Sequence, residues 1–262
     1  MMELKNVIYE KSEGVGTISL NRPEKLNAIS FEMLDELWAL LQDIIVDDDI
    51  HVILIKGEGR YFSAGADLSI LGTLKPGTFR INQRKYWNRV FDQFEDIEKL
   101  TIVALNGPAL GGGVELALCC DLRYAVEDAT LALPEINFGI LPDSGGTARL
   151  PWLIGVPRAK EFILTGEPIT ANTAVGWGLL NGIFSKETFD EEVRKIAVKM
   201  ALKAPIALGL GKQLINRSSQ QRDIKTGLED VMDVQSFLIC TEDYQEAVKA
   251  HQEKRPPNFK GK

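Results

Sequence analysis

Residues 105–118 read Leu-Asn-Gly-Pro-Ala-Leu-Gly-Gly-Gly-Val-Glu-Leu-Ala-Leu. The glycine run 111–113 opens an expected helix, and one acid, Glu115, stands in its first turn among apolar residues. Glycines at a helix start leave backbone N–H groups approachable, and the positive end of the helix dipole favours negative charge there. The stretch therefore predicts a site for an oxygen on which negative charge develops, although a glycine run can also serve close helix packing.

A second acid, Glu135, follows Pro134 in another apolar stretch, residues 129–140. A carboxyl among residues that favour burial is either paired or has a raised pKa, and both conditions suit proton transfer near neutral pH. Each acid has a plainer alternative. Glu115 can be a first-turn residue that the helix dipole favours, and Glu135 can be a turn residue. Because two such acids occur, a paired-carboxylate site is the favoured interpretation.

A third acid, Asp143, lies in residues 141–147, directly before another expected helix. Asp at this place is a typical N-cap, and the alternative is a third catalytic acid. A loop of small residues at 61–68 follows an expected strand and permits close approach of a ligand.

Composition indicates an ordinary globular protein. The chain has 262 residues, 45% of them hydrophobic, and a net charge of -7, which opposes an extended nucleic-acid surface. We expect neither a signal peptide nor a membrane span, and hence a cytoplasmic protein. Cys119 and Cys120 are adjacent and the third cysteine is distant, so no disulfide framework is expected and all three are expected to be buried. Only two histidines occur, which disfavours a metal site.

Hydrophobic periodicity predicts alternating strands and helices. The expected strands are 15–20, 52–56, 101–105, 122–126, 130–133 and 182–184, and the expected helices include 31–46, 79–99 and 112–120. Tyr86 and Trp87 either line a pocket or are buried on a helix. The pattern favours an α/β layered core over residues 1–203 and a helical region over 204–262.

Four stretches together resemble the crotonase superfamily, whose type member is enoyl-CoA hydratase. They are Leu20–Ala28, Phe62–Leu68, Asn106–Leu116 and Leu133–Ile136. The resemblance covers essentially the whole chain. It implies an α/β spiral of ββα turns with a C-terminal helical region, assembled as a homotrimer or as a homohexamer, a dimer of trimers.

The resemblance also implies a reaction, the syn addition of water to a trans-2-enoyl-CoA in the breakdown of fatty acids or related acyl-CoA compounds. The backbone N–H groups of Ala66 and Gly112 would hold the thioester oxygen. Glu115 would activate the water, and Glu135 would supply the proton to Cα. Coenzyme A is part of the substrate, so no separate cofactor and no metal are expected.

Further positions are implied to contact coenzyme A. These are Leu26, Ala28, Ser63, Ala64, Ala66, Asp67 and Leu68, together with Lys254 from a neighbouring subunit. The 204–262 region would thus serve oligomerisation and complete the coenzyme A site. His251 replaces an aromatic residue that family members place against the adenine.

Asp143 departs from the hydratase pattern, which usually has Gly there. An Asp at this position is similar to dienoyl-CoA isomerases and to isomerases of phenylacetate breakdown. However, the former carry Asp where this chain has Glu115, and the latter generally lack the acid at Glu135. The likeness is therefore closest to enoyl-CoA hydratase. The alternatives are an enoyl- or dienoyl-CoA isomerase that uses Asp143 as a proton carrier and, more remotely, a non-catalytic RNA-binding or scaffold relative.

Overall fold

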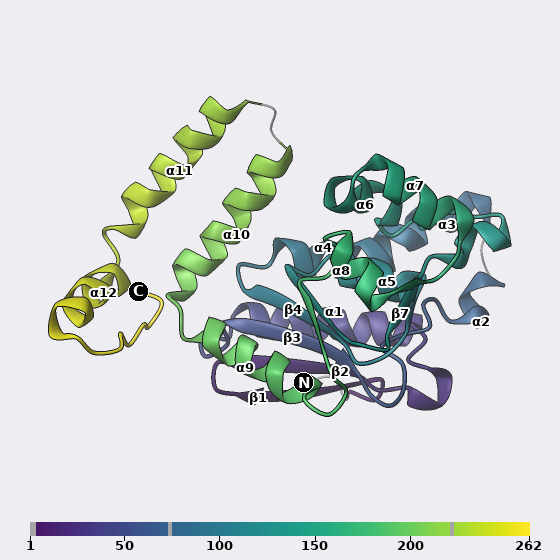
Figure 1. Cartoon of the computed structure of the whole chain (residues 1–262), viewed down its shortest axis with the longest axis horizontal. Helices are drawn as coiled ribbons and strands as arrows, with labels where there is room; N and C mark the ends of the chain where they lie inside the picture. The colour runs from purple at the N-terminus through teal and green to yellow at the C-terminus, as the bar shows by residue number, and fades with distance from the viewer. Residues whose placement is uncertain (1–3, 73–74, 221–222) are drawn as a thin grey trace.

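The computed structural model describes residues 4–72, 75–220 and 223–262. Within them, one sheet has the strand order β1-β2-β3-β4-β6-β9, and a small second sheet has the order β5-β7-β8 (Figure 1). The strands are β1 (Val7–Ser12), β2 (Val15–Leu20), β3 (Val52–Gly57), β4 (Leu100–Leu105), β5 (Ala109–Leu110), β6 (Leu122–Val126), β7 (Thr130–Ala132), β8 (Ile169–Thr170) and β9 (Gly182–Phe184). In the large sheet only the β1–β2 pair is antiparallel.

Helices cover the sheets and form the C-terminal region. They are η1 (Pro23–Lys25), α1 (Phe31–Ile45), α2 (Leu68–Leu71), α3 (Pro76–Asn82), the π-helical η2 (Gln83–Asn88), α4 (Arg89–Asp96), α5 (Gly112–Leu118), η3 (Pro134–Phe138), α6 (Gly146–Ile154), α7 (Val156–Thr165), α8 (Ala171–Gly176), α9 (Phe189–Ala201), α10 (Pro205–Gln220), α11 (Ile224–Leu238) and α12 (Glu242–Glu253). Helix α1 begins at Ser30, whose side chain accepts a hydrogen bond from Met33 N, and its apolar face is buried.

The segments that follow the main strands pair with one another through short stretches of β-type backbone hydrogen bonding. Ile29 pairs with Ala66, Ser63 pairs with Ala109, and Ala109 pairs with Leu131, all in parallel. The segments that follow β2, β3, β4 and β6 therefore lie side by side in chain order. This arrangement is a spiral, as expected, and it brings the small-residue loop at 61–68 against the glycine run.

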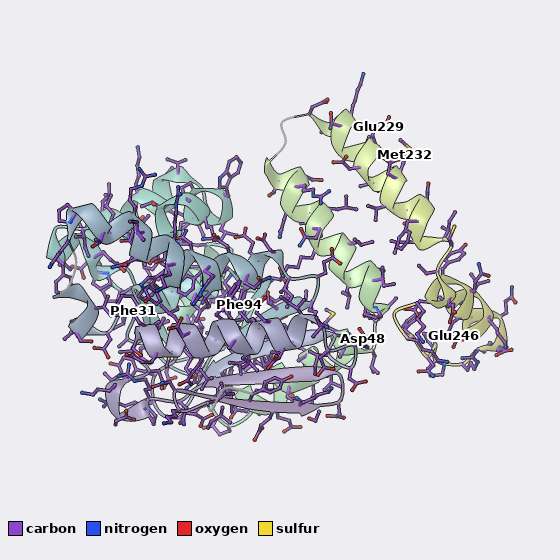
Figure 2. All side chains as sticks on the ribbon, turned by 180° about the vertical axis from the view of Figure 1, so that it is seen from behind. Phe31, Asp48, Phe94, Glu229, Met232 and Glu246 are labelled. Carbon is purple, nitrogen blue, oxygen red and sulfur yellow. The ribbon has the colours of Figure 1, made fainter. Side chains whose placement is uncertain are left out.

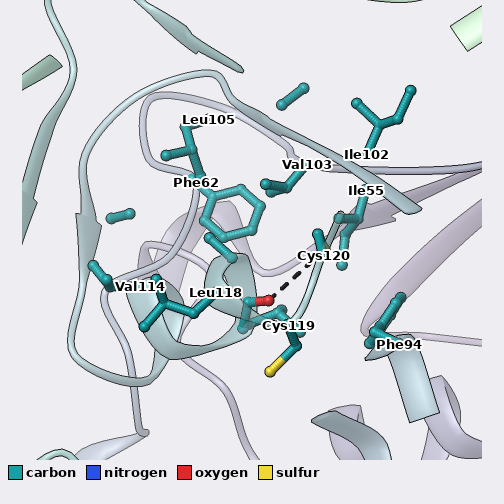
Figure 3. Packing of buried hydrophobic residues seen from close by; sticks show 14 of the residues in the cluster. Ile55, Phe62, Phe94, Ile102, Val103, Leu105, Val114, Leu118, Cys119 and Cys120 are labelled. Carbon is teal, nitrogen blue, oxygen red and sulfur yellow. Dashed lines mark hydrogen bonds between the residues drawn. The ribbon is translucent and has the colours of Figure 1, made fainter. Parts of the chain in front are cut away.

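Helix α5 is buried on every side, because the core closes around it. Figure 3 shows Val114 and Leu118 of α5 close to Phe62 and Leu105, which have no exposed surface. A helix this deeply buried holds its first turn rigidly, which suits a site that needs fixed backbone donors.

The C-terminal helices α10, α11 and α12 lie to one side of the spiral (Figure 1). Lys212 of α10 anchors this region, because its Nζ lies 3.0 Å from Asp121 Oδ2 and donates to Phe94 O at 2.8 Å. Helix α11 carries several exposed apolar side chains, and Figure 2 shows one of them, Met232, on this helix. None of the described helices is long and apolar enough to cross a membrane.

Several expectations need correction. Strand β1 was not predicted, because it is an edge strand with only Val7 buried and so lacks the usual alternation. The single helix expected over 79–99 instead comprises α3, η2 and α4, with a π-helical turn in the middle. Cys119 and Cys120 are buried as predicted, but Cys240 is exposed, because it follows α11 outside the core. The division of the chain at residue 203 remains a prediction.

Candidate active site

A cavity of about 260 Å³ opens where the glycine run, the small-residue loop and the α3–η2 segment meet. Its lining includes seven residues that the sequence singled out: Ala64, Ala66, Leu68, Gly112, Glu115, Glu135 and Asp143. The structure thus brings both glutamates, the third acid and both expected oxygen-binding backbone positions to one cavity.

The backbone N–H groups of Ala66 and Gly112 lie close together at this cavity. A Cβ atom added at Gly112 would lie 3.6 Å from Ala66 N and 2.9 Å from Trp87 Cζ3. Within the described residues, neither N–H donates to a protein acceptor. Two free donors side by side at a helix N-terminus form a suitable site for a carbonyl oxygen that gains negative charge.

Gly111 brings Glu135 close to the start of α5. Its φ of +49° is strained for residues with a side chain, and a Cβ there would lie 2.6 Å from Glu135 Oε1. Gly113 serves the alternative purpose of close packing, since its Cβ would lie 2.8 Å from Ser63 Cβ. Both interpretations of the glycine run therefore hold, each for different glycines.

Glu115 is buried, with 3% of its surface exposed. Its Oε1 accepts hydrogen bonds from Ser144 N and Gly146 N, each at 2.8 Å. Burial raises the pKa of this carboxyl to about 8; the hydrogen bond from Gly146 opposes the rise, and the charges of Asp143 and Glu135 add to it. Glu115 can therefore exchange a proton near neutral pH.

Glu135 stands at the start of η3 with one oxygen unsatisfied. Among the described residues, its buried Oε2 has no hydrogen-bond partner. Burial raises its pKa, and the charge of Asp143 adds to the effect. An unpartnered carboxyl oxygen at the cavity is free to exchange a proton with a bound molecule.

Asp143 does not cap a helix, so the N-cap interpretation is wrong. Helix α6 starts from Gly145, whose φ is +125° and which offers no side-chain cap. Asp143 Oδ1 instead accepts from Gln83 Nε2 at 3.1 Å and from the Ser144 hydroxyl at 3.3 Å. Burial raises the pKa of Asp143. The Gly145-Gly146 pair lets the helix begin two residues later than the Asp suggested.

Several predicted coenzyme A contacts lie outside the cavity lining and have internal partners. Ser63 is fully buried, and its hydroxyl donates to Asn27 O at 2.8 Å and accepts from Gly65 N at 3.1 Å. Asp67 accepts from Ser69 N and pairs with Arg22 at 3.0 Å. The contact between Ser63 and coenzyme A is thus not supported for its side chain, because that side chain is enclosed.

Leu26, Ala28 and Lys254 also lie outside the lining. Leu26 O accepts from Ala64 N at 2.9 Å, so this turn adjoins the cavity wall. Lys254 is exposed at the end of α12, which Figure 1 places far from α5. Their contacts with coenzyme A stay predictions.

Sequence reasoning missed most of the apolar wall and two polar residues, Gln83 and Ser144. The missed apolar residues are Ile70, Phe79, Leu110, Phe138, Ile140 and Leu141. A signal existed in part, because Phe79, Gln83 and Trp87 follow one another at intervals of four and all line the cavity. Trp87 was left open between a pocket and a buried position, and it is both.

Comparisons with known proteins agree with this geometry. The family described as enoyl-CoA hydratase/isomerase matches residues 10–262. The chain is 38% identical over 258 residues to short-chain-enoyl-CoA hydratase of Clostridium acetobutylicum, covering 97% of both proteins. It is 34% identical over 265 residues to 1,2-epoxyphenylacetyl-CoA isomerase of Escherichia coli, covering all of both. The crystal structure of an enoyl-CoA hydratase from Bacillus anthracis matches with a TM-score of 0.94 at 37% identity, covering 98% of this chain and 100% of that one.

Proposed function

This chain belongs to the enoyl-CoA hydratase/isomerase family, and from that premise we propose that it is an enoyl-CoA hydratase, which adds water syn to a trans-2-enoyl-CoA and gives a 3-hydroxyacyl-CoA. One observation carries the proposal: Glu115 and Glu135 line the same cavity as the paired N–H groups of Ala66 and Gly112. Relatives named as hydratases support it.

The proposed reaction uses each group once. The thioester oxygen accepts hydrogen bonds from Ala66 N–H and Gly112 N–H, which stabilise the enolate-like state. Glu115 takes a proton from water as the water oxygen bonds to Cβ, and Glu135 gives a proton to Cα. Burial raises the pKa of Glu135, which favours the protonated form that a proton donor needs, and it raises that of Glu115 to about 8, where this carboxyl can accept a proton near neutral pH.

The test is to add the purified protein to crotonyl-CoA and to follow the loss of enoyl-thioester absorbance together with the product mass. A product 18 mass units heavier supports hydration. Glu135→Gln is expected to lower turnover about 10²–10⁴-fold. The matched control is Glu127→Gln, an exposed acid outside the cavity. Wild-type turnover in Glu135→Gln would show that Glu135 is not the acid.

A second candidate function, double-bond isomerisation, is favoured by one observation. Asp143 lines the same cavity and does not cap α6, so a third acid faces the substrate. Conversion of a 3-enoyl-CoA or 3,5-dienoyl-CoA at constant mass, lost in Asp143→Asn, would support this function. Hydration of crotonyl-CoA with no isomerisation would exclude it.

We further propose a homo-oligomer, a trimer or a dimer of trimers, in which residues 204–262 contribute subunit contacts and Lys254 meets coenzyme A on a neighbouring subunit. Leu228, Met232 and Phe237 on α11 are 53–56% exposed, which supports burial by another copy. Sedimentation should give three or six times the chain mass of 29.1 kDa. A monomer at assay concentration would contradict the assembly.

The remaining expectations are also proposals: a cytoplasmic location, no cofactor besides the coenzyme A of the substrate, and no nucleic-acid partner. The net charge of -7 supports the last. An RNA-binding relative would instead show filter-bound RNA whose affinity falls steeply with salt.

A further inference from the structure

Gln83 spans the wall of the cavity to reach the turn that carries Asp143. It is the first residue of the π-helical turn η2, and such turns are frequent at functional sites. Its side-chain Nε2 donates to Asp143 Oδ1 at 3.1 Å and to Ser144 Oγ at 2.7 Å. The Ser144 hydroxyl in turn donates to Asp143 Oδ1 at 3.3 Å. The amide therefore holds the Asp143 carboxylate from two directions, once directly and once through the hydroxyl.

Asp143 stands between two cavities. It lines the cavity that contains Glu115, and it also lines a larger neighbouring hollow bounded by α4, α6 and α10. A carboxylate at such a partition has space on either side. The amide of Gln83 comes from the wall of the first cavity only, so its hydrogen bond selects that side.

The backbone of the turn has other supports and does not depend on Gln83. Arg149 Nη1 donates to Ser144 O at 3.2 Å, and the Thr147 hydroxyl donates to Pro142 O at 3.3 Å. The N–H groups of Ser144 and Gly146 are held by Glu115 Oε1. Loss of the Gln83 amide should therefore release the Asp143 side chain while the turn keeps its place.

We propose that Gln83 is a positioning residue that directs the Asp143 carboxylate into the reaction cavity, towards Glu115. The inference rests on the proposed hydratase function, in which Glu115 accepts a proton. Gln83 acts only through Asp143, and it contacts neither Glu115 nor Glu135 through any hydrogen bond found in the described residues.

The charges around this pair decide the direction of the effect. Glu115 faces Asp143 and Glu135, whose negative charges both raise its pKa, although burial is the larger cause. Arg149, which donates to Ser144 O beside Asp143, is engaged by Asp92 and Glu95 of α4. When Asp143 turns away or becomes protonated, Glu115 loses a neighbouring negative charge and its pKa falls. The ionised, water-activating form then persists to lower pH.

The test compares pH profiles of kcat/KM for hydration of crotonyl-CoA. Gln83→Met keeps the length of the side chain but cannot donate a hydrogen bond, and it is expected to move the acidic limb down by about one pH unit, a tenfold change on that side. Asp143→Asn should move the limb in the same direction. The double variant should show no shift beyond that of Asp143→Asn, because Gln83 acts through Asp143. Gln93→Met, on α4 and outside this cavity, is the matched control.

The inference would be overturned by either of two results. One is a folded Gln83→Met protein whose acidic limb of kcat/KM lies at the wild-type pH. The other is a shift of that limb by Gln83→Met that is equally large in the wild type and in Asp143→Asn. Failure of the wild type to hydrate crotonyl-CoA would instead count against the proposed function. The inference is then still tested by carboxyl-carbon NMR titration, in which Gln83→Met should raise the pKa of Asp143 and lower that of Glu115; unchanged titrations would overturn it.

Discussion

Replacement of Gly112 by Ala tests the proposed oxygen-binding site with the smallest possible change. The φ of Gly112 lies outside the left-handed region, and the residue starts α5, where Ala is well tolerated. The added methyl carbon would lie 2.9 Å from Trp87 Cζ3 and 3.6 Å from Ala66 N. It would therefore enter the space beside the two N–H donors without straining the backbone.

The expected loss follows from the donors that the methyl group obstructs. Removal of one donor of this kind costs about 2.7–4 kcal/mol in the transition state, or about 10²–10³-fold in kcat. The contact at 2.9 Å from Trp87 requires the indole ring to move by a few tenths of an ångström. Because the ring lines the cavity, a small loss of stability should accompany the loss of turnover.

The assay is hydration of crotonyl-CoA, with the thermal midpoint measured on the same samples. Gly176→Ala is the control, since a Cβ there has no atom within 4 Å. Trp87→Phe combined with Gly112→Ala separates two causes: the smaller ring removes the steric conflict but leaves the methyl beside the donors. Wild-type kcat in folded Gly112→Ala would refute the donor role, and full recovery in the double variant would assign the loss to the ring.

Three further predictions concern charge. The ionised fraction of Glu115 should rise about tenfold between pH 7 and pH 9 in a carboxyl-carbon NMR titration of the free protein, because a group with a pKa of about 8 is about one-tenth ionised at pH 7. The folded protein binds the Glu115 proton more tightly than the unfolded chain does, so the free energy of unfolding should fall from the ordinary carboxyl pKa up to about 8; denaturant titrations of Glu115→Gln should lack this fall. Lys212→Met leaves the half-buried Asp121 without its cation and should cost up to about 3–5 kcal/mol in denaturant unfolding at fixed protein concentration, whereas Lys212→Met with Asp121→Asn should recover much of it.

The fold was predictable where a signal was local. Strands β2, β3, β4 and β6 lie within one residue of the predicted ranges, and α1 carries both a Ser cap and an apolar stripe. Strand β1 escaped prediction because an edge strand exposes one face and one side to solvent. The π-helical turn η2 was not predicted either, because its wider turn places side chains against partners that lie elsewhere in the chain.

The residues of the candidate site were likewise predictable only where the signal was local. Glu115, Glu135 and the glycine run could be predicted from the sequence. An acid among apolar residues and a glycine run before a helix are both unusual, and each is recognisable within a few neighbouring positions. Asp143 was ambiguous because its neighbours fit a cap equally well, and its true partner, Gln83, lies 60 residues away. No local pattern predicts a hydrogen bond between segments so far apart in the chain.

By itself, then, the sequence determined which residues are candidates for the chemistry and which segments form the layered spiral, because these depend on side-chain type and short-range periodicity. Only the tertiary structure decided that Ser144 and Gly146 donate to Glu115, that one oxygen of Glu135 has no partner among the described residues, and that Asp143 faces the cavity. These features arise where distant turns of the spiral pack together, and there burial sets both proton affinity and access.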